Sequence, residues 1–276
     1  MSASLVGSEM CIRDRVTAAA GIFTRDMMHD DDYSTAFFSE SERFFHNRMN
    51  GVLAQYNGKR NSYVEFVCDW EGMYSTLSRE KFRILLAGRH YLDTFYYGFN
   101  YSMFHYAGQQ GAPIENVVDL QLLNPCVGVR FNAFFDFDIK LGALLTAQRD
   151  RSFGHSWEKP CMGEFAFRIS RWGLSLDERL YVGDNIHPFF YGHELEDGTP
   201  LPYGRELYPA ESFFRTDQKV YSRTALSYRR SFFNDTVSVR AEFAAHHDGT
   251  ALGTQQMLVV GVKLLKTVYN SKNHKK

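Results

Sequence analysis

Apolar and polar residues alternate over most of the sequence from about Asn61 to Leu265, and this period of two constrains the fold more than any other feature. Successive side chains of a β-strand point to opposite faces, so the pattern predicts amphipathic strands. In FFDFDIKLGALL, one face carries Phe135, Phe137, Ile139, Leu141, Ala143 and Leu145. The segments NSYVEFVCDW, GEFAFRIS and TVSVRAEFAA alternate in the same way.

We expect about ten strands after residue 46, with turn signals between them. No run resembles a crossover helix, which argues against a parallel α/β sheet. An aromatic content of 16% suits strands, because aromatic side chains pack well on a pleated surface. The predicted fold class is therefore all-β and antiparallel.

Alternation alone fits a soluble β-sandwich as well as a membrane barrel. Three further features favour an up-and-down transmembrane β-barrel of about 10–12 strands. The apolar faces are long enough for the ~9–11-residue strand that spans a bilayer. The polar faces carry both signs of charge, as a closed lumen would. Aromatic residues at strand ends would suit interfacial girdles: Trp70, Tyr91, Tyr96, Tyr97, Trp172, Phe232 and Phe233.

The charges opposite the apolar faces are the predicted lumen residues. They are Glu65, Asp69, Asp136, Asp138, Lys140, Glu164, Arg168, Arg240 and Glu242. Paired carboxylates such as Asp136 and Asp138 lie on one strand face, whereas a glycosidase places its two carboxylates across a cleft. We therefore interpret these side chains as lumen charges rather than as catalytic groups.

The sequence contains no recognisable catalytic motif, and we predict no catalytic residue, metal site or cofactor. His246, His247 and Asp248 could form a general base or part of a metal site, but Asp248-Gly249 favours a hairpin turn. His187 and His193, near Glu194, Glu196 and Asp197, could form a weak cation site; an ordinary polar loop is favoured. The four cysteines, Cys11, Cys68, Cys126 and Cys161, lack zinc-site spacing.

The chain divides into four predicted parts: residues 1–15, 16–45, 46–266 and 267–276. Residues 16–45 are expected to form a loop or a short helix, residues 46–266 the barrel with a long loop at 184–216, and the last part a polar tail. Ser39 and Glu42 could form a capping box for a helix, and a strand from about Asn47 to Tyr56 is the rival interpretation.

The first part, LVGSEMCIRDR at Leu5–Arg15, resembles a translated sequencing adapter. That resemblance implies that native sequence begins near Val16, and that a signal peptide and one or more N-terminal strands have been lost by 5′ truncation.

Near the C-terminus, AEFAAHHDGTALGTQQMLVVGVKL at Ala241–Leu264 resembles the closing hairpin of outer-membrane barrel proteins of the Bacteroidetes type. The phrase PYGRELYPAESFFRTDQKVYSR resembles a loop-to-strand entry from the same broad group. Such chains commonly end in an aromatic residue, whereas this one continues past Leu265 to Lys276. The resemblance implies the outer membrane as location.

We therefore expect a non-enzymatic outer-membrane barrel with a pore, small-molecule-binding or structural role. Its expected partners are outer-membrane lipid and the barrel assembly machinery, with an unknown small-molecule solute. A net charge of -1 gives no reason to expect nucleic-acid binding. Two alternatives stay open: a barrel-borne hydrolase acting on lipid, and a soluble β-sandwich that binds or hydrolyses carbohydrate.

Overall fold

The computed structural model describes residues 8–13, 15–111, 117–151, 156–187, 209–211, 214, 218–234 and 236–262. Its strands form one antiparallel sheet in which each strand pairs with the next along the chain. The strands are β1 (Ser8–Arg13), β2 (Val16–Thr24), β3 (Arg48–Asn57), β4 (Tyr63–Gly72), β5 (Lys81–Leu92), β6 (Phe95–Tyr106), β7 (Val118–Asn132), β8 (Asp136–Asp150), β9 (Cys161–Arg171), β10 (Leu174–Gly183), β11 (Val220–Phe232), β12 (Val237–His247) and β13 (Leu252–Val262).

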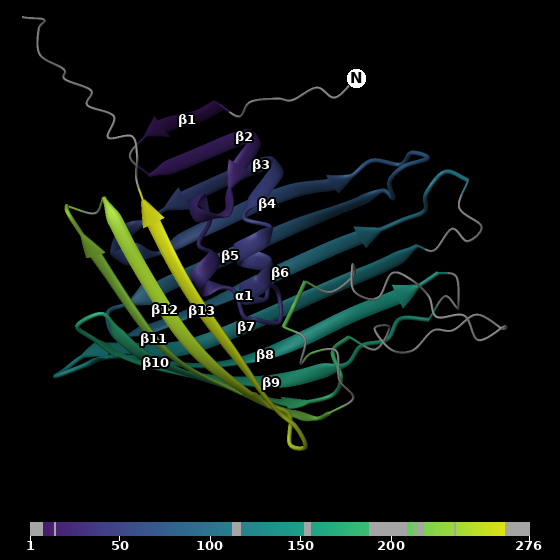
Figure 1. Ribbon diagram of the computed structural model, residues 1–276. Coiled ribbons are helices and arrows are strands. Elements are labelled where there is room, and N and C mark those ends of the chain that lie inside the picture. Colours follow the sequence, from purple (N-terminus) through teal and green to yellow (C-terminus); the bar gives the residue numbers. More distant parts are fainter. Residues whose placement is uncertain are drawn as a thin grey trace, which may run out of the picture.

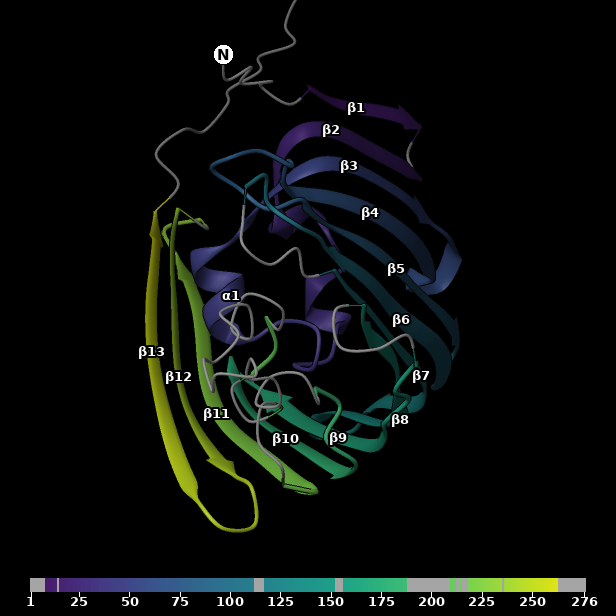
Figure 2. The ribbon, with the colours of Figure 1, turned by 90° about the vertical axis from the view of Figure 1, so that its right-hand side faces the viewer.

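The sheet is strongly curved and surrounds an interior that holds the short helix α1 (Glu40–Phe45) (Figures 1 and 2). The predicted fold class, an all-β antiparallel up-and-down barrel, is thereby confirmed in its architecture. Strands β1 and β13 are the two edges of the sheet, and among the described residues they do not pair with each other (Figure 2). A single meander of this kind is not two stacked sheets, so the structure gives no support to the alternative of a β-sandwich.

The connections differ between the two ends of the sheet. At the end where β2 begins and β13 finishes, β5 and β6 are joined by residues 93–94, and β9 and β10 by residues 172–173. At the opposite end, the chain makes its long connections, residues 25–47 and 184–219. Asp93 and Trp172 adopt positive φ in the short turns, a conformation that tight hairpins require.

Residues 25–47, which we call the inward segment, leave β2 and fold into the interior of the sheet. They contain two single-turn 3₁₀ helices, η1 (Arg25–Met27) and η2 (Asp30–Asp32), followed by α1. Tyr33, Phe37 and Phe38 pack with inner-face residues of the sheet such as Leu53 and Leu85 in one buried cluster. The inward segment is thus part of the core that fills the interior.

The structure resolves the two interpretations of the residues around Ser39 by containing both elements. The Ser39 hydroxyl accepts a hydrogen bond from the Glu42 amide at 2.9 Å and caps α1, and β3 begins three residues after α1 ends. The expectation of only loop or helix over residues 16–45 is wrong for Val16–Thr24, which form β2. This strand, VTAAAGIFT, is rich in Ala and lacks the polar–apolar contrast that marks the others.

Pro125 lies within β7 and does not break it. The pairing of β7 with β8 skips Asn124 and Pro125, whereas its pairing with β6 continues through both residues, so the proline affects only one of the two ladders. Strand β1 lies within the adapter-like segment and pairs with β2.

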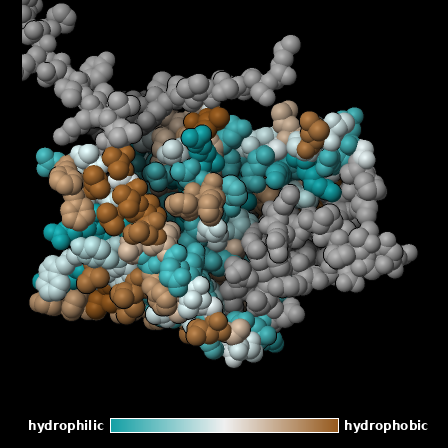
Figure 3. Space-filling view, viewed as in Figure 1, coloured by the Kyte–Doolittle hydropathy of each residue, from teal (hydrophilic) through white to brown (hydrophobic). Residues whose placement is uncertain are grey.

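The outer face of the sheet is apolar over much of its extent. Figure 3 shows hydrophobic residues gathered over the strands at the left of the view. Large apolar side chains at outward positions of successive strands are exposed: Val64, Phe66, Phe95, Phe99, Val127, Leu141, Leu145, Phe165, Leu176, Leu180, Leu226, Phe243, Leu258, Val260 and Val262. None of the helices in the described part of the chain is long and apolar enough to cross a membrane.

Aromatic side chains are exposed near both ends of the strands. Trp70 stacks on Phe82 near one end, and Trp172 and Phe233 are exposed in turns at the other. Tyr91 and Tyr96 do not belong to this set. Their strand positions place them on the inner face, where they are 8% and 3% exposed, so their assignment to a girdle is wrong.

Gly128 makes room for the Tyr96 ring, because the two are cross-strand partners on the inner face. A Cβ at Gly128 would lie 2.3 Å from Tyr96 Cζ and 2.6 Å from the Ile139 carbonyl oxygen. Since that carbonyl is backbone, we expect Gly128→Ala to lower the free energy of unfolding by about 1–3 kcal/mol. Denaturant titration in detergent measures the loss. Gly253→Ala is the control, because its Cβ would meet nothing within 4 Å, and an equal effect at both positions would contradict this account.

Candidate lumenal site

The interior face and the inward segment together form the candidate site. Its first anchor is Asp32, at the end of η2. Its Oδ2 accepts a hydrogen bond from the Tyr63 hydroxyl at 2.7 Å, and its Oδ1 pairs with Arg89 Nη1 at 2.6 Å. Asn100 donates to the Asp32 carbonyl at 2.9 Å. Three strands, β4, β5 and β6, thereby hold one residue of the inward segment.

Glu65 is a second anchor for the same segment. Its carboxylate accepts hydrogen bonds from the His29 amide at 2.9 Å and the Tyr33 hydroxyl at 3.1 Å. Gln55 on β3 also donates to it at 2.5 Å. Glu65 is 1% exposed, so this predicted lumen charge is covered by the inward segment rather than by solvent.

A third anchor links the inward segment to the opposite wall. Glu164 pairs with Lys140 Nζ at 3.1 Å and accepts from Asn124 at 2.9 Å and the Tyr181 hydroxyl at 3.1 Å. That hydroxyl also lies 3.0 Å from the Ser34 hydroxyl. Tyr181 thus connects Glu164 on the wall to Ser34 of the inward segment through buried hydrogen bonds, and these fix the position of the segment.

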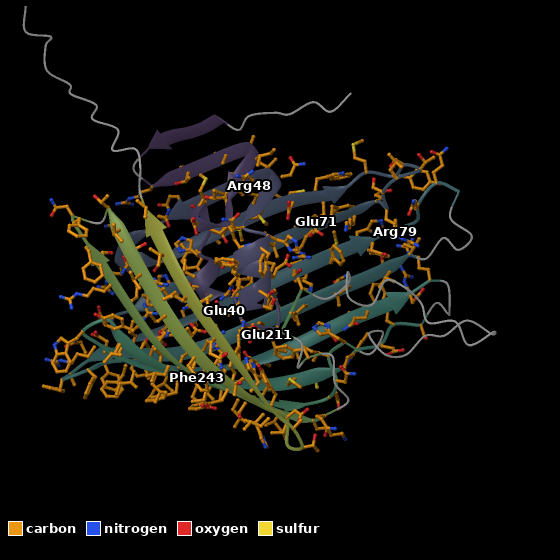
Figure 4. All side chains as sticks on the ribbon, in the orientation of Figure 1. Glu40, Arg48, Glu71, Arg79, Glu211 and Phe243 are labelled. Carbon is orange, nitrogen blue, oxygen red and sulfur yellow. The ribbon has the colours of Figure 1, made fainter. Side chains whose placement is uncertain are left out.

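The described part of the 184–216 connection also folds inward. The Pro209 carbonyl accepts from the Ser39 amide at 2.8 Å, and Glu211 accepts from the Glu40 amide at 2.9 Å. Figure 4 shows Glu40 and Glu211 close together in the view, inside the curve of the sheet. The start of α1 is therefore bound by both the wall and this connection.

Three of the cavities that described residues line lie beside the inward segment, with volumes of about 610, 300 and 230 Å³. The largest of these three lies between the inward segment and β11–β13, and its lining includes Arg229, Arg240, Met257 and Val259. Asp31 lines all three cavities and is exposed. The cavities therefore meet around Asp31.

Most arginines in this region are neutralised by a carboxylate. Arg168 and Arg179 both pair with Asp177 at 2.9 Å. Arg240 pairs with Glu242 at 2.8 Å and with Glu40 at 3.4 Å. The wall thus carries a dense ladder of ion pairs along the inner positions of β9–β12.

All nine predicted lumen charges occupy inner-face positions of their strands. Glu65, Asp69, Lys140 and Glu164 are buried, and Lys140 also lines the 230 Å³ cavity. The other five line the two smaller cavities: Asp136, Asp138, Arg168, Arg240 and Glu242. Asp138 pairs with Arg130 at 2.6 Å.

The structure does not assemble His246, His247 and Asp248 into one site. His246 Nδ1 lies 2.5 Å from the Tyr221 hydroxyl on the inner face, whereas His247 faces outward. Asp248 Oδ1 accepts the amides of Thr250 and Ala251, so it caps the β12–β13 turn and its pKa is lowered by those hydrogen bonds. Asp248 and Gly249 lie in the turn that this dipeptide predicts, whereas His246 and His247 belong to β12.

His187 is 2% exposed and packs edge-on against Phe214, away from water. His193, Glu194, Glu196 and Asp197 lie outside the described residues. Within the part of the chain that is described, no three histidine, cysteine or acidic side chains are grouped so that they could hold a metal ion.

Ser222 and His247 are cross-strand neighbours on the outer face of β11 and β12. Among the described residues no hydrogen bond joins the two side chains, and His247 Nδ1 instead accepts the Gly249 amide at 3.1 Å. A serine hydrolase needs its histidine within hydrogen-bond reach of the nucleophile. The pair therefore gives no support to the hydrolase alternative.

Several residues of the site were missed by the sequence reasoning. On β10 and β11, the inner positions Arg179, Arg223 and Arg229 alternate with outward residues such as Leu180 and Leu226, and this register could have revealed them. Asp31, Asp32 and Glu40 could not have been found in this way. They lie in a segment without strand periodicity, and long-range packing alone brings them into the interior.

Glu40 gives the site a defined pH response. Burial alone would raise its pKa, but Arg43 and Arg240 outweigh burial and hold the pKa of Glu40 below its ordinary value of 4.5. A lowered folded-state pKa means that the charged contact is fully present above pH 4.5 and is lost as the pH falls through the lowered value.

We therefore expect an environment-sensitive dye at Phe45→Cys, in a background without native cysteines, to report release of α1 only below pH 4.5. In Glu40→Gln the contact is already absent at neutral pH, so that acid transition should disappear. An unchanged transition in Glu40→Gln would show that another group controls it. Phe45 suits the label because it is 72% exposed.

Comparison with known proteins adds little to this geometry. No protein-family model matches the sequence, and no curated protein matches it. Among solved structures, the chain is similar to the crystal structure of a double variant of OccD1 (OprD), with 15% sequence identity and a TM-score of 0.38. The match covers 89% of this chain and 74% of that one. A likeness at this level does not identify a family.

Proposed function

We propose that this chain is an outer-membrane β-barrel protein of the channel type, with a lumen that a small solute enters. The observation that carries the proposal is that the outer face of the sheet is apolar, whereas charged side chains are buried on its inner face. Leu141, Phe243 and Leu258 are 57%, 47% and 71% exposed on the outside, while Lys140, Glu164 and Arg223 are buried inside. Water disfavours such an apolar exterior, and hydrocarbon requires it.

The ends of the sheet support an orientation. Outer-membrane barrels have short periplasmic turns and longer extracellular loops. On this basis the end with residues 93–94 and 172–173 faces the periplasm, and the end with residues 25–47 and 184–219 faces outward. The resemblance of Ala241–Leu264 to a Bacteroidetes closing hairpin agrees with this location, and we infer that outer-membrane lipid and the barrel assembly machinery are its partners.

The filled interior favours a narrow or gated channel over a wide pore. Larger barrels of 16–18 strands leave an open aqueous channel, whereas the described residues form 13 strands and hold the inward segment in their centre. The charged cavities beside that segment are the space that remains for a solute.

The proposal is tested by expressing the chain behind an outer-membrane signal peptide and isolating the outer membrane. We expect the protein to resist extraction by carbonate and to migrate faster on unheated than on boiled gels, as folded barrels do. Purified protein in planar bilayers should give small ion currents. Recovery of folded protein from the soluble periplasm would contradict the proposal.

A further inference from the structure

We propose that the lumen binds a small zwitterion with an apolar side group, with Asp31 holding its cationic group and Arg229 its anionic group. This inference rests on the proposed function, because it names the class of solute that the channel would admit. Among the described residues, Asp31 and Arg229 are charged side chains that remain without a partner once the ion pairs of the wall are assigned.

Asp31 and Arg229 both line the 610 Å³ cavity and the neighbouring 300 Å³ cavity. Within the described part of the chain, neither side chain forms an ion pair or a hydrogen bond, and both are exposed. Asp26 also lines the larger cavity, but it does not reach the smaller one. Glu40, Arg43 and Arg240 line both cavities as well, but each of them is held in an ion pair. Asp31 and Arg229 are thus the two unpaired opposite charges that both cavities share.

The other charged side chains that line the two cavities are less suited to bind a solute. Arg43 is held by Asp30 at 3.0 Å and by Glu40 at 3.3 Å, and Arg240 is held by two carboxylates. A solute that recruited such a group would have to break an existing pair. An unneutralised carboxylate and guanidinium gain new charge-assisted hydrogen bonds without that loss.

The same cavity supplies an apolar surface. Met257 and Val259 on the inner face of β13 line it, together with Met28 and Phe44 of the inward segment. Its volume of about 610 Å³ lies within the ~300–1,000 Å³ range of small-molecule sites. Two opposite charges beside an apolar wall match a solute that carries an ammonium, a carboxylate and a hydrocarbon side group.

Calorimetric titration of the full chain in detergent tests this assignment with three probes of one shape. Leucine carries both charges, leucinamide only the cation and 4-methylpentanoate only the anion. We expect leucine to bind at least about tenfold more tightly than either analogue. Asp31→Asn should weaken leucine and leucinamide by about tenfold and leave 4-methylpentanoate unchanged. Arg229→Gln should weaken leucine and 4-methylpentanoate but not leucinamide.

Asp93→Asn and Lys59→Gln are matched controls in short turns outside the cavities, and they should bind leucine as the unmodified protein does. Asp31→Glu and Arg229→Lys keep each charge and should retain most of the binding. They distinguish loss of the charge from misfolding as the cause of weaker binding in the neutral variants. Leucine binding no tighter than its analogues, or unaffected by both neutral variants, would overturn the site. Bilayer currents from the same preparation separate this result from failure of the channel itself, since titration requires no conduction.

Discussion

Replacing Leu141 with arginine should destabilise the membrane-inserted protein by about 2–4 kcal/mol. Leu141 occupies an outward position of β8 and is 57% exposed. Its cross-strand partners, Val127 on β7 and Phe165 on β9, are exposed apolar residues as well. Arginine at this point would place a charge among lipid chains, where no group of the sheet compensates it.

The expected loss is measured by denaturant titration of protein refolded into vesicles, followed by tryptophan fluorescence. Ser170→Arg is the matched control, since Ser170 lies on the inner face beside a charged cavity and tolerates a new charge. If water surrounded the sheet, Leu141→Arg would cost almost nothing, because an exposed arginine is well solvated. Equal and small effects at both positions would therefore contradict a lipid-facing exterior.

Replacing Asp32 with alanine should release the inward segment from the wall and raise the ion current through the barrel. The change removes the partner of Arg89, whose side chain is 5% exposed, and leaves a buried cation unpaired. Breaking a buried pair on one side costs about 3–5 kcal/mol. Part of that cost can be relieved if the segment moves and admits water to Arg89.

Single-channel recording measures the change, and accessibility of a cysteine at Phe38 to a thiol reagent reports the movement. Phe38 is 0% exposed when the segment is docked. Asp26→Ala is the control, because Asp26 is exposed and forms no ion pair among the described residues. The double change Asp32→Ala with Arg89→Met should restore docking in part. Unchanged current and labelling in Asp32→Ala would show that Asp32 does not hold the segment.

The local sequence pattern was sufficient to predict the strands of the sheet, but not the segment that fills its interior. Alternation in β4, β8, β9 and β12 predicted which side chains share a face, because a strand has only two faces to offer. The capping residue Ser39 predicted a helix for the same local reason. Nothing near Asp30–Asp32 indicated that this acidic run would lie inside the sheet, since its partners Tyr63 and Arg89 are distant in sequence.

Alternation also left the environment of the sheet undecided, since it shows which residues share a face but not which face lies outside. Tyr91 and Tyr96 illustrate the difficulty. Their position near strand ends suggested an interfacial role, but their register places them on the inner face, where Tyr96 donates to Asp138 at 2.7 Å. The direction of curvature, which the structure supplies, turns the apolar face outward.

The outward direction of that face is tested most directly by spin labels along one strand. Single cysteines at outward and inward positions of β8, labelled in a background without native cysteines, are compared in vesicles for collision with oxygen and with a water-soluble nickel complex. We predict that labels at Ile139, Leu141 and Leu145 favour oxygen, as lipid-facing sites do, and that labels at Asp138 and Lys140 do not. Preferential collision of the Leu141 and Leu145 labels with nickel would contradict the membrane barrel.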